Sequence, residues 1–292
     1  MSTIFTRRSF VIGSSLLLPA VSLAPALAKS DKFDAQFAAL EDKSGGRLGV
    51  FVLDTKTNET MAYRADERFA MCSTFKALAA AFVLARVDKG EESLDRHIKY
   101  TKADLLEYSP GLEKNIAKGM TVGQMCDAIV TLSDNGAANI LLDSFGGPKA
   151  LTAWLRSIGD DRTRLDRTEP ELNIVNKGDE RDTTTPEAMT RTLGRLLLGD
   201  VLKPASRDQF AEWLKANTTG DERLRAGVPS TWTVGDKTGT SGRGDAGDIG
   251  FLQPTADRTV LVSAYICEST KKTKELNPVF AGVARLVAGT IG

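Results

Sequence analysis

Two residues with the chemistry of a nucleophile and its base stand at the start of the most apolar segment of the chain. Ser73 and Lys76 precede residues 77–87, ALAAAFVLARV, in which Arg86 is the only polar residue, so this segment predicts a buried helix. Spaced i and i+3, the two side chains would share one face of the first turn, where free N–H groups stabilise negative charge. The serine hydroxyl could then attack a carbonyl carbon, with the lysine as base if burial lowers its pKa.

The spacing alone does not establish a nucleophile. A second Ser-x-x-Lys occurs at Ser269 and Lys272, in a polar stretch after a predicted strand. A serine at the start of a helix often caps it, because its hydroxyl accepts a hydrogen bond from an N–H group of the first turn. Taken by itself, the pair therefore favours a helix cap at Ser73.

The composition restricts which other groups can take part in catalysis. The chain of 292 residues has one histidine, His97, and three cysteines without a Cys-x-x-Cys spacing, so no catalytic metal site is expected. His97 lies in a polar stretch and is expected on the surface. The 38 basic and 38 acidic residues balance, and the absence of a basic block argues against nucleic-acid binding. A hydrolase of this composition would use Lys, Glu or Asp as its general base.

Two further motifs occur once each, in a fixed order after Ser73 and Lys76. They are Ser133-Asp134-Asn135, in the helical middle of the chain, and Lys237-Thr238-Gly239, on a predicted strand beside a glycine-rich turn. Either tripeptide alone is uninformative. Together, the three motifs resemble the set found in class A β-lactamases and penicillin-binding proteins. The resemblance covers essentially the whole chain after residue 28.

The resemblance implies a role for each motif residue. Ser133 would pass a proton to the departing lactam nitrogen, with the cationic Lys237 polarising its hydroxyl. The oxyanion hole would consist of the N–H groups of Ser73 and Thr240. Asn135 would hold the side-chain amide of the substrate. The other residues implied in substrate binding, several of them on a strand edge that could take a carboxylate, are Tyr108, Asn173, Arg223, Thr238, Gly239 and Thr240.

The resemblance covers both hydrolases and penicillin-trapping peptidases, and a loop after Arg167 distinguishes the two. Residues 169–173, Glu-Pro-Glu-Leu-Asn, match the omega-loop motif of the family, which implies that Glu169 and Asn173 hold the hydrolytic water. Arg167 and Asp182 stand where the family closes this loop with an ion pair, so the loop is expected at about residues 167–182. Whether Lys76 or Glu169 takes the first proton stays open.

The surroundings of the motifs are similar to those of broad-spectrum and carbapenem-hydrolysing members. The similarity rests on four residues: Cys72, Tyr108, Arg223 and Thr240. Ser241 replaces the cysteine that bridges to the position of Cys72 in carbapenem-hydrolysing members, and Ala80 replaces the partner of Cys126. Neither disulfide of the family is therefore expected, and Cys72, Cys126 and Cys267 should all be free. Ala246 replaces an arginine of the narrow penicillinases, which favours Arg223 as the carboxylate-binding arginine.

The hydrophobic pattern predicts an α/β fold of the α+β type. Apolar runs bounded by turn residues predict five strands of one antiparallel sheet, at 48–53, 60–63, 231–237, 248–252 and 259–267. Helical patterns lie between them, for example at 121–145, 148–158, 186–198 and 206–216. We expect a discontinuous α/β domain, residues 29–71 and 216–292, and an inserted all-helical domain, residues 72–215, with the active site in the crevice between them.

The first 28 residues predict an export signal. A basic segment ends in Arg7 and Arg8, residues 10–18 are apolar, and residues 26–28 are small, as at a cleavage site after about Ala28. The paired arginines are typical of twin-arginine export, and the alternative is an ordinary Sec signal, since an arginine pair also occurs by chance in such basic segments. The mature protein is therefore expected in the periplasm, without membrane attachment and as a monomer.

The predicted function is hydrolysis of the β-lactam amide of penicillins and cephalosporins, conferring antibiotic resistance. A Ser73 acyl-enzyme would be deacylated by water that Glu169 activates, without a cofactor. One alternative is a D-Ala-D-Ala carboxypeptidase or penicillin-binding protein with the same Ser73, a class that lacks the Glu169 loop. The other is a penicillin-binding sensor domain, which would be acylated without turnover.

Overall fold

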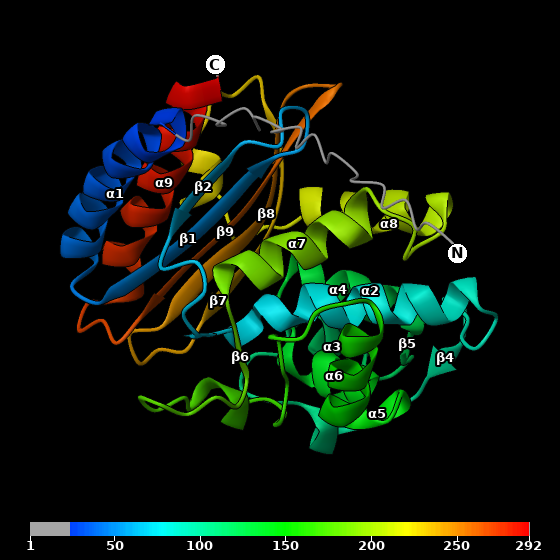
Figure 1. Ribbon diagram of the computed structural model, residues 1–292. Coiled ribbons are helices and arrows are strands. Elements are labelled where there is room, and N and C mark those ends of the chain that lie inside the picture. The colour runs from blue at the N-terminus through cyan, green and yellow to red at the C-terminus, as the bar shows by residue number, and fades with distance from the viewer. Residues whose placement is uncertain (1–23, 292) are drawn as a thin grey trace, which may run out of the picture.

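The computed structural model describes residues 24–291, in which a five-stranded antiparallel sheet has helices on both faces (Figure 1). The strand order is β2-β1-β9-β8-β7. The strands are β1 (Arg47–Asp54), β2 (Thr60–Tyr63), β7 (Thr233–Thr240), β8 (Ala246–Thr255) and β9 (Arg258–Cys267). The predicted fold class is confirmed, with all five strands close to their expected positions. The export signal predicted for residues 1–28 lies, as far as residue 23, outside the described residues.

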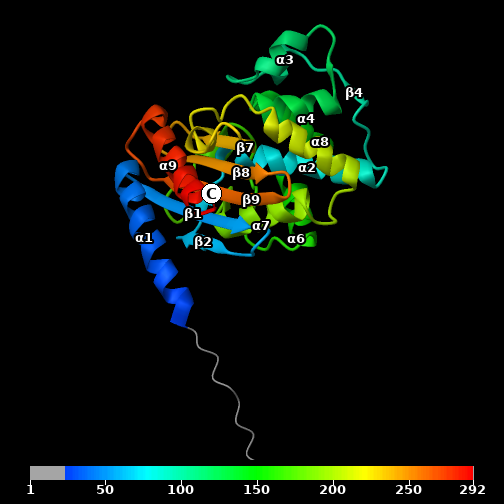
Figure 2. The same ribbon diagram turned by 90° about the horizontal axis from the view of Figure 1, so that it is seen from above.

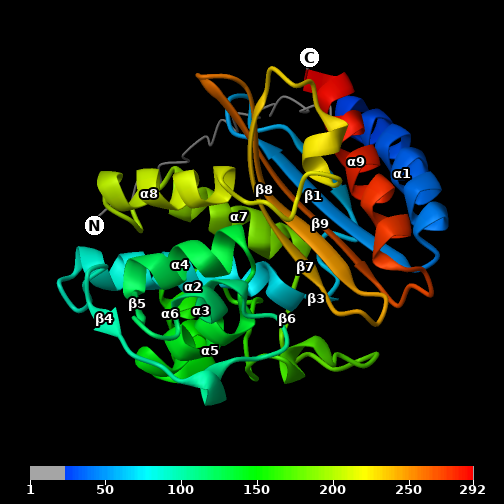
Figure 3. The same cartoon turned by 180° about the vertical axis from the view of Figure 1, so that it is seen from behind.

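Both faces of the sheet are covered, which explains why its strands β1 and β9 consist of nearly continuous apolar runs. On β9, Val260, Val262 and Ala264 pack into the core shared with α1 (Ala24–Ser44) and α9 (Thr273–Ile291). Leu261 and Tyr265, which point to the other face, pack into the core of the helical part. The helices α1 and α9 lie side by side on the outer face of the sheet (Figures 1 and 3).

The helical part is built around α2 (Phe75–Asp88), the helix predicted from the apolar run. Every residue from 75 to 81 is buried. The helices that pack most extensively on α2 are α4 (Val122–Thr131), α8 (Pro204–Lys215), α5 (Asn135–Ser144) and α6 (Gly147–Ser157). Seen from above, α4 and the short α3 (Pro110–Asn115) lie far from α1, at the other end of the molecule (Figure 2). A buried α2 leaves only its first turn for polar chemistry.

The prediction of one continuous helix at 121–145 is wrong, because two helices, α4 and α5, occupy this segment. The chain breaks between α4 and α5 at Ser133, which adopts a left-handed conformation with φ +61°. Asp134 then caps α5, since its side chain accepts a hydrogen bond from the N–H of Ala137 at 2.8 Å. The polar tripeptide 133–135 therefore ends one helix and starts the next, which turns Ser133 toward the start of α2.

The structure places α7 (Pro186–Leu197) against the sheet, although the predicted helical domain of residues 72–215 includes it. It packs on β1 and β9, and the Thr190 hydroxyl lies 2.8 Å from that of Ser263. By its contacts, this helix covers the inner face of the sheet. The domain boundaries themselves stay a prediction.

Two short strand pairings complete the framework that positions the site. β3 (Phe69–Ala70) pairs with β6 (Thr183–Thr184), which joins the segment before Ser73 to the end of the loop at 167–182. β4 (His97–Ile98) pairs with β5 (Met120–Thr121), and His97 is exposed there, as predicted. Within residues 24–291, no helix combines the length and hydropathy that a membrane span requires.

Candidate active site

Ser73 lies in the single 3₁₀ turn Cys72–Thr74 that leads into α2. It does not cap the helix: the residue at the cap position of α2 is Thr74, and no side chain there accepts a hydrogen bond. The Ser73 hydroxyl instead donates to Glu169 Oε1 at 3.3 Å and accepts from Lys76 Nζ at 3.0 Å. The helix-cap interpretation is therefore wrong, and the hydroxyl faces a base on each side.

Lys76 is the centre of the polar cluster, and its side chain is fully buried. Its ammonium group lies 3.0 Å from Glu169 Oε1, donates to the Ser133 carbonyl at 2.8 Å and donates to Asn135 Oδ1 at 2.5 Å. Burial lowers the pKa of Lys76, while the carboxylate of Glu169 acts in the opposite direction. A lysine with a lowered pKa, in contact with a serine hydroxyl, can accept its proton.

Ser133 and Lys237 form the second half of the cluster. Lys237 Nζ donates to the Ser133 hydroxyl at 3.1 Å and to the carbonyl of Thr238 at 2.8 Å. Burial, followed by the charge of Lys76, lowers the pKa of Lys237 to about 7. Ser133 therefore lies between two lysines, since Lys76 Nζ is 3.4 Å from its hydroxyl. A proton can pass through this hydroxyl in either direction.

Two buried acids lie near Lys237, and the sequence analysis did not identify them. Asp236 accepts a hydrogen bond from Asn217 at 2.7 Å and lies 2.6 Å from Arg225 Nη2. Burial and the neighbouring Asp236 raise the pKa of Asp248. Burial is unfavourable for both carboxylates, and nearby cations partly offset it: Arg225 and Lys237 for Asp236, Arg223 and Lys237 for Asp248. In the sequence, each is one acid among 38 and carries no local signal.

Glu169 enters the cluster from the loop opposite α2, and its side chain is fully buried. Its second oxygen, Oε2, accepts a hydrogen bond from Asn173 Nδ2 at 2.6 Å. Asn139 on α5 fixes the backbone of Glu169, because its amide bonds both the N–H, at 2.9 Å, and the carbonyl, at 2.8 Å. The sequence analysis missed Asn139, which lies outside the three motifs. The carboxylate is thus held within reach of Ser73.

The loop at 167–182 is closed as the resemblance implied. Arg167 Nε contacts Asp182 Oδ2 at 2.5 Å, and Asp182 Oδ1 accepts the N–H groups of Asp166, at 2.7 Å, and Arg167, at 2.9 Å. The carbonyl of Asp182 accepts the N–H of Met71 at 3.0 Å. The end of the Glu169 loop is therefore bonded to the backbone just before Ser73.

A pocket of about 290 Å³ collects the residues predicted to bind substrate. Tyr108 stands at its rim and is 52% exposed. Thr219 also lines it, with its hydroxyl 2.5 Å from that of Thr238, and was not predicted. The pocket is lined by Ser73, Tyr108, Ser133, Asn135, Asn173, Thr219, Arg223, Thr238, Gly239 and Thr240. Most of these residues come from the start of α2, the α4–α5 break, the Glu169 loop and β7, while Tyr108, Thr219 and Arg223 come from connecting segments. The pocket therefore lies where the helical part meets the sheet.

The outer strand β7 runs against the backbone of Ser73. A Cβ atom added at Gly239 would lie 2.7 Å from the Met71 carbonyl oxygen and 3.1 Å from the Ser73 nitrogen, so only glycine fits. Arg223, which is 4% exposed, donates to the Gly239 carbonyl at 2.9 Å and to the Thr240 hydroxyl at 2.7 Å. Its guanidinium therefore stands beside the pocket at the edge of β7, where an anionic group of a substrate could reach it.

The described residues contain no cluster of three or more His, Cys, Asp and Glu side chains that could hold a metal ion. All three cysteines are free and buried, in agreement with the loss of both disulfide partners. Mass spectrometry of unreduced protein, alkylated after unfolding, is therefore expected to find three modified thiols. Burial raises the pKa of the Cys126 thiol, so alkylation before unfolding should be far slower. A disulfide within the chain would contradict this prediction.

The comparisons with known proteins agree with this geometry. A model of the beta-lactamase enzyme family matches residues 32–291. The carbapenem-hydrolyzing beta-lactamase KPC of Klebsiella oxytoca is 45% identical over 286 residues, which covers 98% of this chain and 97% of the relative. Beta-lactamase AST-1 of Nocardia asteroides is 46% identical over 259 residues, 89% of this chain and 84% of the relative.

Solved structures give the same result. An ancestral (GNCA) class A beta-lactamase superposes with a TM-score of 0.87 at 59% sequence identity, covering 89% of this chain and 100% of that one. Since similarity of this extent leaves no other family open, the chain belongs to the class A serine β-lactamases, the antibiotic-resistance enzymes that hydrolyse β-lactams.

Proposed function

We propose that this enzyme hydrolyses penicillins and cephalosporins through an ester on Ser73, and that Glu169 activates the water that cleaves this ester. The observation that carries the proposal is the position of one carboxylate. Glu169 Oε1 lies 3.3 Å from the Ser73 hydroxyl, and its Oε2 is bonded to Asn173. A base held beside the acylated oxygen is what separates hydrolysis from permanent acylation.

In the acylation step, the Ser73 oxygen attacks the lactam carbonyl carbon while its proton passes to Lys76 or Glu169, both of which contact the hydroxyl. The oxyanion that forms would be bound by the N–H groups of Ser73 and Thr240. The C–N bond then breaks, and the nitrogen takes the Ser133 hydroxyl proton. Ser133 is reprotonated from a neighbouring lysine, Lys76 or Lys237.

In the deacylation step, a water molecule attacks the ester carbonyl and gives a proton to Glu169. The Ser73 oxygen leaves as the ester bond breaks and takes the proton from Glu169, which returns to its carboxylate form. The ring-opened acid is then released and the enzyme is regenerated. Asn173 is suited to hold the attacking water, because its Nδ2 donates a hydrogen bond to Glu169 while its Oδ1 is buried without a protein partner. Such an oxygen can accept a hydrogen bond from the attacking water.

Neither competing activity accounts for the Glu169 loop. A D-Ala-D-Ala carboxypeptidase with the same Ser73 would lack this carboxylate. A sensor domain must stay acylated, and a general base beside the ester would promote its hydrolysis. A purified sample mixed with a chromogenic cephalosporin should therefore show sustained turnover. A single burst equal to the enzyme concentration would instead favour the sensor domain.

The substrate range follows from the open end of the pocket near β7. Gly242 is exposed and Thr240 adds a hydroxyl at the pocket wall, so bulky cephalosporin side chains should be admitted. We expect turnover of an oxyimino-cephalosporin as well as of benzylpenicillin, measured as loss of lactam absorbance. Carbapenem hydrolysis is a weaker expectation, because Ser241 cannot form the disulfide of the carbapenem-hydrolysing members. Failure to turn over any oxyimino-cephalosporin would contradict the proposed range.

We also propose that the enzyme is exported by the twin-arginine route and works as a periplasmic monomer. Arg7 and Arg8 are the residues on which the export prediction depends. Replacing both with lysine should leave the activity in the cytoplasm after cell fractionation, since the charge is kept but the arginine pair is lost. Unchanged periplasmic activity would point to the general secretion route.

A further inference from the structure

The turn between β7 and β8 is built around the hydroxyl of Ser241. This hydroxyl donates to Asp245 Oδ2 at 2.9 Å and accepts the N–H of Arg243 at 2.9 Å. The backbone closes in the same way, because the N–H of Ser241 donates to the carbonyl of Asp245 at 3.0 Å. Ser241 directly follows Thr240, so the first residue of this turn adjoins a proposed donor of the oxyanion hole.

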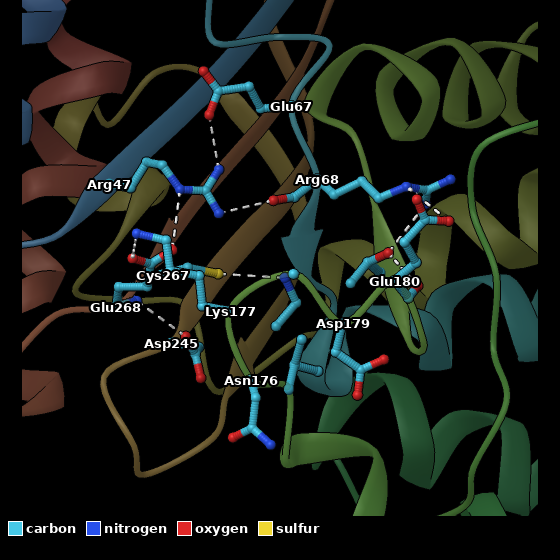
Figure 4. A pocket seen from close by; sticks show the side chains of 14 residues that line it. Arg47, Glu67, Arg68, Asn176, Lys177, Asp179, Glu180, Asp245, Cys267 and Glu268 are labelled. Atoms are coloured by element: carbon cyan, nitrogen blue, oxygen red, sulfur yellow. Dashed lines mark hydrogen bonds and ion pairs between the residues drawn. The ribbon is translucent and has the colours of Figure 1, made fainter.

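The carboxylate of Asp245 links that turn to two further segments. It is 7% exposed, and its other oxygen, Oδ1, accepts the N–H of Glu268 at 3.3 Å, just beyond the end of β9 (Figure 4). Its charge also influences two nearby thiols. Burial raises the pKa of Cys72 and of Cys267, and the negative charge of Asp245 raises both further. One carboxylate therefore connects the end of β7 with the end of β9, close to the residue that precedes Ser73.

Side-chain packing alone does not hold this region. Asp245 borders a cavity of about 330 Å³ beneath residues 175–180, shown in Figure 4, and a second of about 370 Å³ next to residues 269–273. With space on both sides, hydrogen bonds are the contacts that can fix the turn. A buried carboxylate is costly unless it is hydrogen-bonded, and here both oxygens are.

We propose that Asp245 is a positioning residue for the reaction, which fixes Thr240 and the end of β7 against Ser73. The close approach of Gly239 to Met71 and Ser73 leaves little tolerance for movement of this strand. The inference rests on the proposed function, because it assumes that the N–H of Thr240 binds the oxyanion.

The first test compares kinetics with stability. Asp245→Ala should lower kcat for benzylpenicillin by about 10-fold to 100-fold with little change in KM. The reason is that a displaced Thr240 N–H stabilises the oxyanion less in the transition states of acylation and deacylation. Asp245→Asn should recover part of this loss, since its amide can still bond Glu268 and Ser241. The matched control is Asp54→Ala at the other end of the sheet, where a 5% exposed carboxylate accepts the N–H of Lys56 at 2.9 Å and pairs with Arg258. It should lower Tm and leave kcat unchanged.

The second test observes the oxyanion hole directly. In a Glu169→Ala background, the infrared C=O stretch of the penicillin ester should shift to higher frequency when Asp245→Ala is added, because weaker hydrogen bonds lengthen the carbonyl less. An unchanged frequency together with a wild-type kcat in the folded Asp245→Ala protein would overturn the inference. If Glu169→Ala forms no ester at all, the proposed function fails instead, and the two failures are thus distinguishable.

Discussion

Replacing Glu169 with alanine is expected to leave the enzyme able to form the Ser73 ester but slow to hydrolyse it. A positioned general base contributes about 100-fold to 10,000-fold, so the deacylation rate should fall by at least that lower factor. Acylation should continue in part, because Lys76 Nζ still lies 3.0 Å from the Ser73 hydroxyl. Rapid-mixing kinetics with a chromogenic cephalosporin should show a burst followed by very slow turnover.

The matched control for this prediction is Glu171→Ala. Glu171 lies two residues further along the same loop, and it is exposed, so its removal alters the loop charge without touching the cluster. This variant should keep the wild-type rate. Turnover by Glu169→Ala at the wild-type rate would show that the omega-loop assignment is wrong and would favour the peptidase interpretation.

Replacing Lys76 with alanine is expected to have a comparable effect on the other half-reaction. The change removes the ammonium that contacts Ser73, Ser133, Asn135 and Glu169, and it removes one of the two candidate bases for acylation. The value of kcat/KM for benzylpenicillin should fall by about 100-fold or more. Acylation rates from single-turnover mixing would give the size of the effect.

Lys76→Arg separates the two explanations for such a loss. An arginine keeps the positive charge beside Glu169 but is a very weak base. If Lys76→Arg is as slow as Lys76→Ala, Lys76 takes the first proton; if arginine restores most of the rate, Glu169 takes it and the lysine contributes its charge. A wild-type acylation rate in Lys76→Ala would contradict any role for this residue.

Much of the fold could be predicted from the sequence, because the sheet is buried on both faces. The apolar runs of β1, β8 and β9 are long enough to be recognised without any knowledge of their partners. The break at Ser133 was missed, because residues 121–145 keep a helical period on both sides of it. Which layer α7 would join could not be predicted either, since an amphipathic helix shows only that one of its faces is buried.

The residues of the three motifs and the Glu169 loop could be identified because they occur together in a known order. The residues that support them could not. Asn139 acts by hydrogen bonds to the N–H and the carbonyl of Glu169, 30 residues away in the chain. Asp245 likewise accepts a hydrogen bond from the N–H of Glu268. Contacts of this kind depend on the folded path of the backbone, which no local pattern of residue types records.

The most direct test of the account is the intact mass of the protein after incubation with benzylpenicillin. Glu169→Ala should gain the mass of one penicilloyl group, retain it far longer than the wild type does, and carry it on the peptide that contains Ser73. Ser73→Ala should gain nothing. A persistent adduct on wild-type protein, or an adduct on any residue other than Ser73, would contradict the proposed mechanism.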